Sequence, residues 1–195
     1  MINTNVMNYK KSLTGRVYNF ALVLGTSWLI AAGAWISIPL PFSPVPVTLQ
    51  TLVVLMAGLL LGKNLGAAAV LAYLVQGAAG MPFFAGGRSG PAVLLGPTGG
   101  YLLGFLAAVY IAGLLSELQF RSTMVRAAVC LLTGSIVIYI FGLAWLARFV
   151  PESQVLALGL YPFLAGDLLK LLVGIGLVRG GSTALAWLFP GQKRR

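Results

Sequence analysis

The sequence predicts an all-α integral membrane protein, a single transmembrane domain of six helices over residues 1–195. Three observations indicate this class. Hydrophobic residues make up 59% of the chain and charged residues only 8%, whereas soluble domains carry about 25% charged residues. The mean hydropathy is +0.95. Six apolar segments approach the ~20 residues that a helix needs to cross a bilayer.

The six predicted spans follow one another with short connections. Pro39 ends the first span, and the segment PLPFSPVPV leads to the second. Lys63 and Asn64 mark a tight turn between the second and the third. After the sixth span, a short apolar stretch up to Phe189 is expected at the membrane interface. The spans cover residues 17–38, 48–62, 65–80, 99–118, 125–149 and 160–178.

The basic residues are divided unequally between the two sides of the membrane. With six spans both termini share one side, and ten of the 13 basic residues fall there. These ten are Lys10, Lys11, Arg16, Lys63, Arg121, Arg126, Arg179, Lys193, Arg194 and Arg195. Only Arg88 and Arg148 fall on the other side, and Lys170 lies within the sixth span. Because Lys and Arg collect in cytoplasmic loops, we expect both termini in the cytoplasm. The net charge of +10 then orients the helices and requires no nucleic acid.

A glycine- and proline-rich segment at residues 80–105 separates the third and fourth spans. Pro82, Pro91 and Pro97 interrupt helix formation, and the glycines permit turns. Arg88 is the only charged residue in this segment. The segment is predicted to form a cap loop that suits an amphipathic, anionic small molecule. The alternative is an ordinary extracytoplasmic loop with one solvated arginine.

Small residues recur every fourth position in three places, a spacing that lets helix backbones approach closely in lipid. One series spans the second turn and another follows the fourth span, and for both we favour packing inside the chain over a partner interface. In the first span the choice between internal packing and docking on a partner stays open. The residues are Gly58, Gly62 and Gly66; Gly96, Gly100, Gly104, Ala108 and Ala112; and the pairs Ala21/Gly25 and Ser27/Ala31.

Two of the three acidic residues are expected in solvated ion pairs. Glu117 precedes Arg121 by four residues, and Glu152 lies in an outer loop near Arg148. Both pairs suit a polar surface at the end of a span.

The third acid, Asp167, lies within the apolar sixth span, and Lys170 follows three residues later. Positions i and i+3 share a helix face. A charge at mid-helix costs roughly 2.5–3.5 kcal/mol on insertion scales, so such ions mark functional sites. The alternative is a buried pair that only neutralises itself. We favour function, because leucine would pack better at both positions.

Catalysis has little support in this composition. Histidine is absent, Cys130 is the single cysteine, and no second carboxylate accompanies Asp167. The segment GLLLGKN at residues 58–64 lacks the spacing and the Ser/Thr of a phosphate-binding loop. We therefore expect no catalytic residue, no metal and no cofactor, and an energy source in a partner or an ion gradient.

Three segments carry a resemblance to a known family: AGAWISIPLPFSPVPVTLQTL at residues 32–52, GMPFFAGG with GPTGGYLLGF within residues 80–105, and GDLLK at residues 166–170. In these segments the chain resembles the BioY family, the biotin-specific S components of energy-coupling factor (ECF) vitamin transporters. The resemblance covers nearly the whole chain. It implies a compact six-helix bundle in a bacterial or archaeal cytoplasmic membrane, with biotin bound near the outer face.

The resemblance also implies a function and partners. The chain is expected to be a high-affinity, non-enzymatic biotin-capture subunit that docks on a membrane coupling protein driven by two ATPase subunits. It places Asp167 and Lys170 in the ligand pocket. Many relatives have a small residue where this chain has Arg88, so the role of Arg88 rests on its chemistry alone.

The chemistry of biotin agrees with this expectation. Asp167 can accept from a ureido N–H, and Lys170 can donate to the ureido carbonyl. Arg88 and the turn at residues 96–100 are candidates for the tail carboxylate. Aromatic residues are expected to wall the fused ring: Trp35, Phe42, Phe83, Phe84 and Tyr101.

Three other functions stay open at this point. An S component for another vitamin, such as thiamine, would share the fold and differ in ligand. A small membrane enzyme acting on lipids would use Asp167 as its catalytic residue. A purely structural membrane subunit would bind no ligand.

Overall fold

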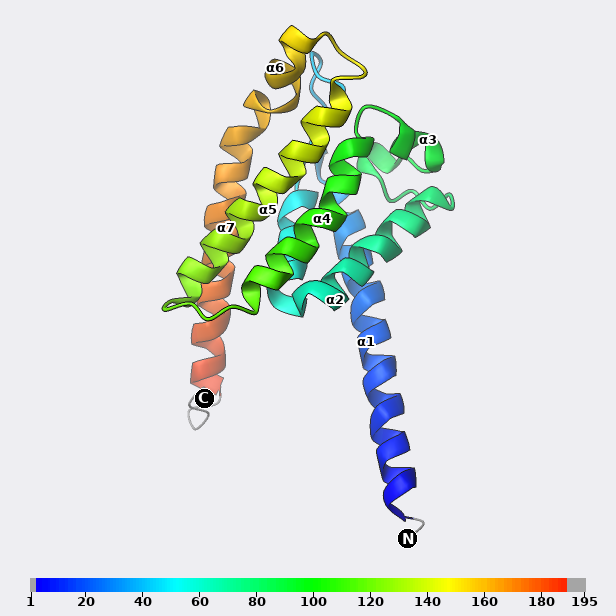
Figure 1. Cartoon of the computed structure of the whole chain (residues 1–195), viewed down its shortest axis with the longest axis vertical. Helices are drawn as coiled ribbons and strands as arrows, with labels where there is room; N and C mark the ends of the chain where they lie inside the picture. Colours follow the sequence, from blue (N-terminus) through cyan, green and yellow to red (C-terminus); the bar gives the residue numbers. More distant parts are fainter. Residues whose placement is uncertain (1–2, 189–195) are drawn as a thin grey trace.

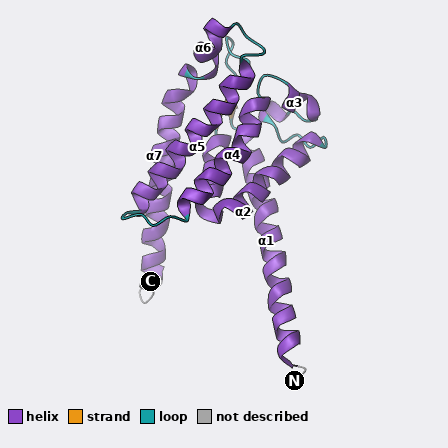
Figure 2. Cartoon of the chain, viewed as in Figure 1, coloured by secondary structure: helices purple, strands orange, loops and turns teal. Residues whose placement is uncertain are grey.

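The computed structural model describes residues 3–188, and the side chains of residues 15–180. It is almost entirely helical, as predicted, and its loops gather at the two ends of the helices (Figures 1 and 2). The long helices are α1 (Asn3–Trp35), α2 (Gln50–Ala78), α4 (Gly99–Ser116), α5 (Thr123–Leu146) and α7 (Tyr161–Leu188). Within the described residues, five segments are long and apolar enough to cross a membrane.

The second and third predicted spans are the two arms of α2. The arms meet at Gly62, whose φ of 77° and ψ of 177° are not helical. This φ is accessible to glycine at little cost. The chain reverses there, so α2 has the shape of a V (Figure 1). With α2 counted as two arms the chain makes six passes, and α1 begins at the end of the molecule where α7 finishes.

An ion pair joins the bend of α2 to the end of α4. Lys63 Nζ lies 2.6 Å from Glu117 Oε2, so the bend of α2 is tied to the end of α4. The bend of α2 packs closely on Gly113 of α4, because a Cβ at Gly113 would lie 2.4 Å from the backbone nitrogen of Lys63. The predicted partner of Glu117, Arg121, is therefore corrected to Lys63. Sequence spacing favoured the residue one helical turn away, but the fold brings a closer cation.

The small-residue series of α2 and α4 pack inside the chain, as predicted. A Cβ at Gly58 would lie 2.5 Å from the Val109 carbonyl oxygen of α4. A Cβ at Gly100 would lie 2.1 Å from Cβ of Trp145 on α5. The backbones of α2, α4 and α5 therefore meet with no room for larger side chains, which makes α4 the central helix of the bundle.

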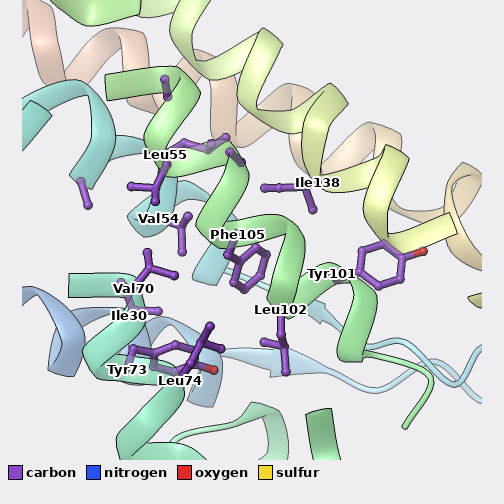
Figure 3. Close-up of a cluster of buried hydrophobic side chains, with 14 of the residues drawn as sticks. Ile30, Val54, Leu55, Val70, Tyr73, Leu74, Tyr101, Leu102, Phe105 and Ile138 are labelled. Atoms are coloured by element: carbon purple, nitrogen blue, oxygen red, sulfur yellow. The ribbon is translucent and has the colours of Figure 1, made fainter. Parts of the chain in front are cut away.

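A buried apolar cluster fills the space between α1, α2, α4 and α5 (Figure 3). It includes Ile30, Val54, Leu55, Val70, Tyr73, Leu74, Tyr101, Leu102, Phe105 and Ile138. The helix α7 lies at the edge of the bundle, and few of its residues up to Gly180 are buried. Leu168 and Leu169 are more than half exposed, as expected for a face turned to lipid.

Two helices extend beyond the predicted spans. The helix α1 starts at Asn3, well before Val17. The helix α7 continues through Gly180 to Leu188, so the apolar stretch expected at the membrane interface continues this helix up to that residue. The extension of α1 is polar and basic sequence, which hydropathy does not count as membrane-spanning. Phe189 lies outside the described residues.

The connections at the opposite end of the molecule have short regular elements. Strands β1 (Ser37–Ile38) and β2 (Val47–Thr48) pair antiparallel after α1. Between α2 and α4 lie a 3₁₀ turn, η1 (Ala85–Gly87), and the helix α3 (Pro91–Leu95). A second 3₁₀ turn, η2 (Glu152–Gln154), and α6 (Val155–Gly159) precede α7. The glycine- and proline-rich segment is thus partly helical.

Candidate functional site

A pocket opens beneath the connections described above, at the end of the molecule opposite the termini. The space between its walls is about 680 Å³, part of which is open solvent at its mouth. Its lining comes from two of these connections, the one after α1 and the one between α2 and α4, and from the helices α2, α4, α5 and α7. The lining residues are Val45, Pro46, Thr48, Gln50, Thr51, Phe84, Ala85, Arg88, Val93, Thr98, Tyr101, Leu102, Phe105, Ser135, Ile138, Tyr139, Phe163, Asp167 and Lys170.

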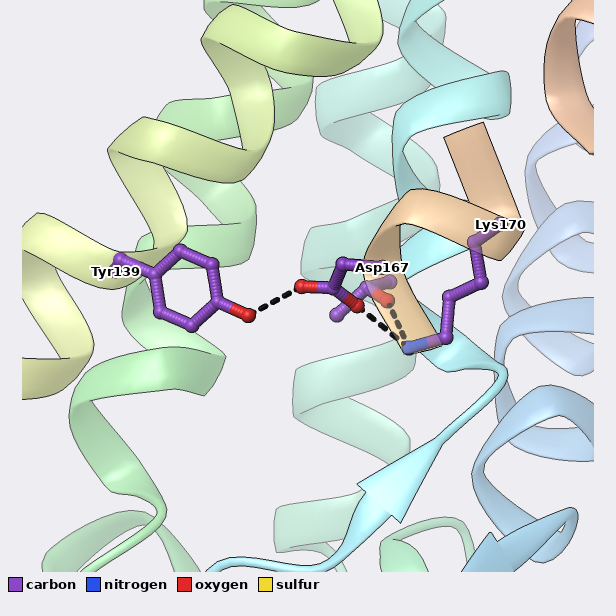
Figure 4. A network of polar contacts seen from close by, with 4 residues as sticks. Tyr139, Asp167 and Lys170 are labelled. Atoms are coloured by element: carbon purple, nitrogen blue, oxygen red, sulfur yellow. Dashed lines mark hydrogen bonds and ion pairs between the residues drawn. The ribbon is translucent and has the colours of Figure 1, made fainter. Parts of the chain in front are cut away.

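Four side chains form a polar network on one wall of the pocket (Figure 4). Lys170 Nζ donates to Asp167 Oδ1 at 2.8 Å and to Thr51 Oγ1 at 3.0 Å. The Tyr139 hydroxyl donates to Asp167 Oδ2. The network therefore joins α2, α5 and α7. The side chains of Asp167 and Lys170 are 17% and 13% exposed, which is low for charged residues.

The placement of Asp167 and Lys170 follows from the helical repeat of α7. Residues three apart share a face, and this face turns toward α2 and α5, whereas Leu168 and Leu169 turn outward. The pair retains capacity for a ligand. Lys170 has three N–H groups and uses two, and each carboxylate oxygen of Asp167 holds one donor although it can accept more.

The rest of the pocket is largely apolar. Phe84 is 1% exposed and meets the ring of Tyr73 edge-on, with the centroids 5.7 Å apart. The Tyr101 hydroxyl donates to the Gly159 carbonyl at 2.8 Å, so its hydrogen bond serves the fold and its ring lines the pocket. Phe105 and Phe163 add two more rings. The arrangement suits a flat or compact apolar ring with a polar edge.

Arg88 supplies a positive charge at the lining of the pocket. Its Nε donates to the Ala85 carbonyl at 3.1 Å, and its backbone carbonyl accepts from the Phe84 N–H at 3.0 Å. Neither of the two ion pairs among the described side chains includes Arg88. The guanidinium is therefore oriented by the turn while its charge stays unpaired in that part of the chain, which suits an anionic ligand group.

Comparison with known proteins agrees with this architecture. The model described as "BioY family" matches residues 5–187. The chain belongs to the BioY family. The "Probable biotin transporter BioY" of Pyrococcus horikoshii is 43% identical over 143 residues, which are 73% of this chain and 82% of that protein. The "Biotin transporter BioY" of Thermotoga maritima is 42% identical, over 74% of this chain and 84% of that protein.

A solved structure gives the same result for the fold. The crystal structure of "the S-component for biotin from an ECF-type ABC transporter" matches with a TM-score of 0.77 at 29% identity. The match covers 87% of this chain and 93% of that structure. This BioY-family chain is thus a multi-pass membrane protein, and its relatives indicate transport and not catalysis. The alternative of a membrane enzyme with a catalytic Asp167 is not supported.

Five of the predicted ligand residues line the pocket of this BioY-family chain, and three do not. Trp35 is 60% exposed, and its indole N–H donates to the Pro82 carbonyl at 2.6 Å. Phe83 packs against Trp28, with the ring centroids 5.7 Å apart. Phe42 is also exposed. Phe83 and Phe84 both pack on the ring of Tyr73, but only Phe84 reaches the pocket lining. The residues in the lining are Asp167, Lys170, Arg88, Tyr101 and Phe84.

Several polar residues of the pocket were not predicted from the sequence, among them Gln50, Thr51, Ser135 and Tyr139. Thr51 and Tyr139 hold the charged pair, and Gln50 and Ser135 lie in the lining. A signal was present, because each is a polar residue within an apolar span. Ser135 and Tyr139 are also four residues apart, which places them on one face of α5.

The four small residues predicted to dock on a partner fall on different sides of α1. Ser27 is fully buried and accepts a hydrogen bond from Gln76 Nε2 at 3.0 Å. Ala31 is also buried, so both residues pack inside the chain. The prediction that Ser27 and Ala31 dock on a partner is therefore wrong. Ala21 and Gly25 are exposed. Docking on a partner stays a prediction for this second pair.

Among the described residues, no group of three or more His, Cys, Asp or Glu side chains could hold a metal ion. Cys130 is buried in α5. The polar side chains of the pocket are therefore suited to hydrogen bonds with a ligand.

Proposed function

We propose that this chain is the S component that captures biotin for an ECF transporter in the cytoplasmic membrane. One observation carries the proposal: in a BioY-family fold, the pocket combines the Asp167–Lys170 pair with an aromatic wall and with Arg88. These three features match the three parts of biotin, a polar cyclic urea, an apolar fused ring and an anionic tail.

The Asp167–Lys170 pair would read the ureido group. A ureido N–H can donate to Asp167, and the free N–H of Lys170 can donate to the ureido carbonyl. Because Tyr139 and Thr51 already hold the two side chains in place, little side-chain ordering remains for the ligand to impose. Such preorganisation favours high affinity.

The aromatic wall and Arg88 would bind the remaining parts of the ligand. Burial of the fused ring against Phe84, Tyr101 and Phe105 removes apolar surface from water. Arg88 can form a charge-assisted hydrogen bond to the tail carboxylate. A thiamine ligand is cationic, so it would place a positive charge near Lys170 or Arg88, which disfavours that alternative.

The two outer connections would close over the bound ligand. Val45, Pro46 and Thr48 come from the connection after α1, and Ala85 and Arg88 come from the connection after α2. All five line one pocket, which supports a closure in which residues 39–47 and 81–98 together cover the ligand. A site that can close excludes water and slows release of the ligand.

Transport would require further subunits. The sequence contains no nucleotide-binding motif, so the energy for uptake would come from a membrane coupling protein and two ATPase subunits. The exposed Ala21 and Gly25 of α1 are candidates for the contact with that coupling protein, because small residues allow close approach of helices.

The proposed ligand is tested with the intact chain purified in detergent. Mass spectrometry of the small molecules released on denaturation is expected to detect biotin. Calorimetric titration of ligand-free protein with biotin and with thiamine is expected to show tight binding of biotin alone. Tight binding of thiamine would support the alternative S component, and binding of neither would refute the proposal.

A further inference from the structure

An open cavity lies in the connection between α4 and α5, at the end of the molecule that holds the bend of α2 (Figure 1). The space between its walls is about 660 Å³, part of which is open solvent. The basic residues place this end on the cytoplasmic side. Four of the six lining residues are polar or charged, and the six are Leu118, Gln119, Phe120, Ser122, Thr123 and Arg126.

Arg126 is the charged residue in the lining of this cavity. Its Nε is shielded from solvent and has no hydrogen-bond partner among the described residues. Neither of the two ion pairs between described side chains includes Arg126. A buried donor without an acceptor is unfavourable. In the wall of a cavity, such a donor indicates an acceptor that arrives with a ligand, and the charge of the guanidinium favours an anion.

The acidic side chains of the protein are engaged elsewhere. The sequence has three of them. Glu117, the nearest along the chain, binds Lys63 at 2.6 Å. Asp167 holds Lys170 at 2.8 Å in the ligand pocket, and Glu152 lies in the connection that precedes α6. The anion that would balance this end of α5 therefore has to come from outside the chain.

Neutral donors surround the guanidinium of Arg126. The Ser122 Oγ accepts from the Met124 backbone N–H at 3.2 Å, which leaves its hydroxyl proton available for a ligand. Thr123 and Gln119 add a hydroxyl and an amide to the lining. The 24-residue helix α5 also begins here, and its positive end adds to the local potential. Charged and neutral donors in this arrangement suit the oxygens of a phosphate group.

The surroundings of the cavity favour a phosphate that belongs to a lipid. Leu118, Met124 and Val125, which lie in or beside the lining, are at least 40% exposed. The helix α5 is long and apolar enough to cross a membrane. Its 24 residues extend about 36 Å, more than the ~30 Å of the hydrocarbon core, so its first turn reaches the level of the headgroups. A lipid could thus place its headgroup in the cavity and its chains against the apolar side chains.

We propose that this cavity binds the phosphate of an anionic phospholipid from the cytoplasmic leaflet, with Arg126 as the central contact. Arg121 is exposed in the same connection and adds a second positive charge. Basic pockets at the cytoplasmic ends of membrane helices favour anionic lipids. The inference goes beyond the proposed function, because this cavity shares no lining residue with the ligand pocket.

Native mass spectrometry of the intact chain in a neutral detergent tests the proposal by measuring the binding of added lipid. Phosphatidylglycerol is the anionic probe, and phosphatidylcholine, which has a phosphate but no net charge, is the comparison. Arg126→Gln removes the charge and keeps a polar side chain. The control is Arg16→Gln, which removes an exposed cation of α1 on the same side of the membrane, outside the cavity. Thermal unfolding establishes that both variants are folded, without reference to biotin.

The unaltered chain is expected to bind phosphatidylglycerol about tenfold more tightly than phosphatidylcholine, as for a charge-assisted hydrogen bond. Arg126→Gln is expected to lose this preference, and Arg16→Gln is expected to keep it. Equal losses in the two variants would overturn the proposal, because the lipid would then respond to the general surface charge.

The unaltered protein provides a second test that does not depend on the folding of a variant. Inorganic phosphate is added to the complex with phosphatidylglycerol, and the lipid is expected to stay bound because its chains add apolar contacts. Displacement by an equal concentration of phosphate would overturn the lipid assignment in favour of a free anion. Equal affinity for phosphatidylglycerol and phosphatidylcholine would overturn the proposal as well. Neither result would bear on the binding of biotin at the opposite end of the molecule.

Discussion

The hydroxyl of Tyr139 donates a hydrogen bond to Asp167 across the contact between α5 and α7. Lys170 donates to the other oxygen of the same carboxylate. The carboxylate is therefore held from two sides before any ligand binds. Because α7 lies at the edge of the bundle, this contact also fixes the orientation of its polar face relative to the pocket.

Tyr139→Phe is expected to weaken biotin binding about three- to tenfold, since it removes one hydrogen bond that orients Asp167. The ring volume is kept, so the fold is expected to persist. Calorimetric titration measures the change. Tyr110→Phe is the matched control, because Tyr110 is exposed on α4 outside the pocket lining. Equal affinities for both variants would show that Tyr139 does not orient the ligand-binding carboxylate.

Arg88→Met is expected to remove the preference of the protein for biotin over biotin methyl ester. The reason is that the guanidinium would pair with the tail carboxylate, which the ester lacks. The loss for biotin is expected to be about ten- to hundredfold, as for a hydrogen bond to a charged group. The ratio of the two dissociation constants is the measurement.

Arg148→Met provides a matched control for Arg88. Arg148 lies on the same outer side, but its guanidinium stacks 4.6 Å from the ring of Trp145, outside the pocket lining. This variant is expected to retain the preference for biotin. A preference that survives in Arg88→Met would assign the carboxylate to another group.

The passes of the chain and the polar face of α7 could be predicted because their causes are local. A run of apolar residues defines a span, and a spacing of three places Asp167 and Lys170 on one face. The contacts of that face are not local. Thr51 and Tyr139 are separated from their partners by 119 and 28 residues, so only the packing of α2, α5 and α7 shows that they meet.

Two failures of sequence analysis have the same physical origin, which is side-chain direction. Phe83 and Phe84 are neighbours of the same type and both pack on Tyr73, but only Phe84 reaches the pocket lining, whereas Phe83 also contacts Trp28. On α1, Gly25 and Ser27 are two residues apart and therefore face different sides of the helix. Their roles depend on how the segment is rotated against its neighbours, which tertiary packing decides.

Ser89→Cys is expected to react from outside the cell with an impermeant thiol reagent. Ser89 is exposed in the segment that lines the pocket mouth, and the native Cys130 is buried, so background labelling is expected to be low. Biotin is expected to slow the reaction if residues 81–98 close over the ligand. Labelling that requires opened membranes would contradict the orientation derived from the basic residues.

Gly25→Trp is expected to abolish biotin uptake in cells while leaving biotin binding unchanged. A Cβ at Gly25 meets no atom within 4 Å, so the chain itself can accept a larger side chain there. The loss would come from blocked approach of the coupling protein. Uptake and binding are measured on the same variant. Normal uptake would exclude this face of α1 from docking.

Replacement of both Asp167 and Lys170 by apolar residues distinguishes a ligand-binding pair from a structural one. Buried ion pairs can often be replaced by apolar residues of similar size without loss of stability. A pair that only neutralises itself would therefore be dispensable, and Asp167→Leu combined with Lys170→Met would bind biotin almost normally.

If the pair reads the ureido group, the same double variant is expected to stay folded and lose binding. Asp167→Asn alone keeps the volume but replaces a charged acceptor by an amide, and a lost charge-assisted hydrogen bond costs about 1.5–3 kcal/mol, or roughly ten- to hundredfold in affinity. Lys170→Met is expected to cost a similar amount. Thermal unfolding establishes that each variant is folded, and titration with biotin then decides between the two roles. Near-native affinity in the folded double variant would remove both residues from the binding site.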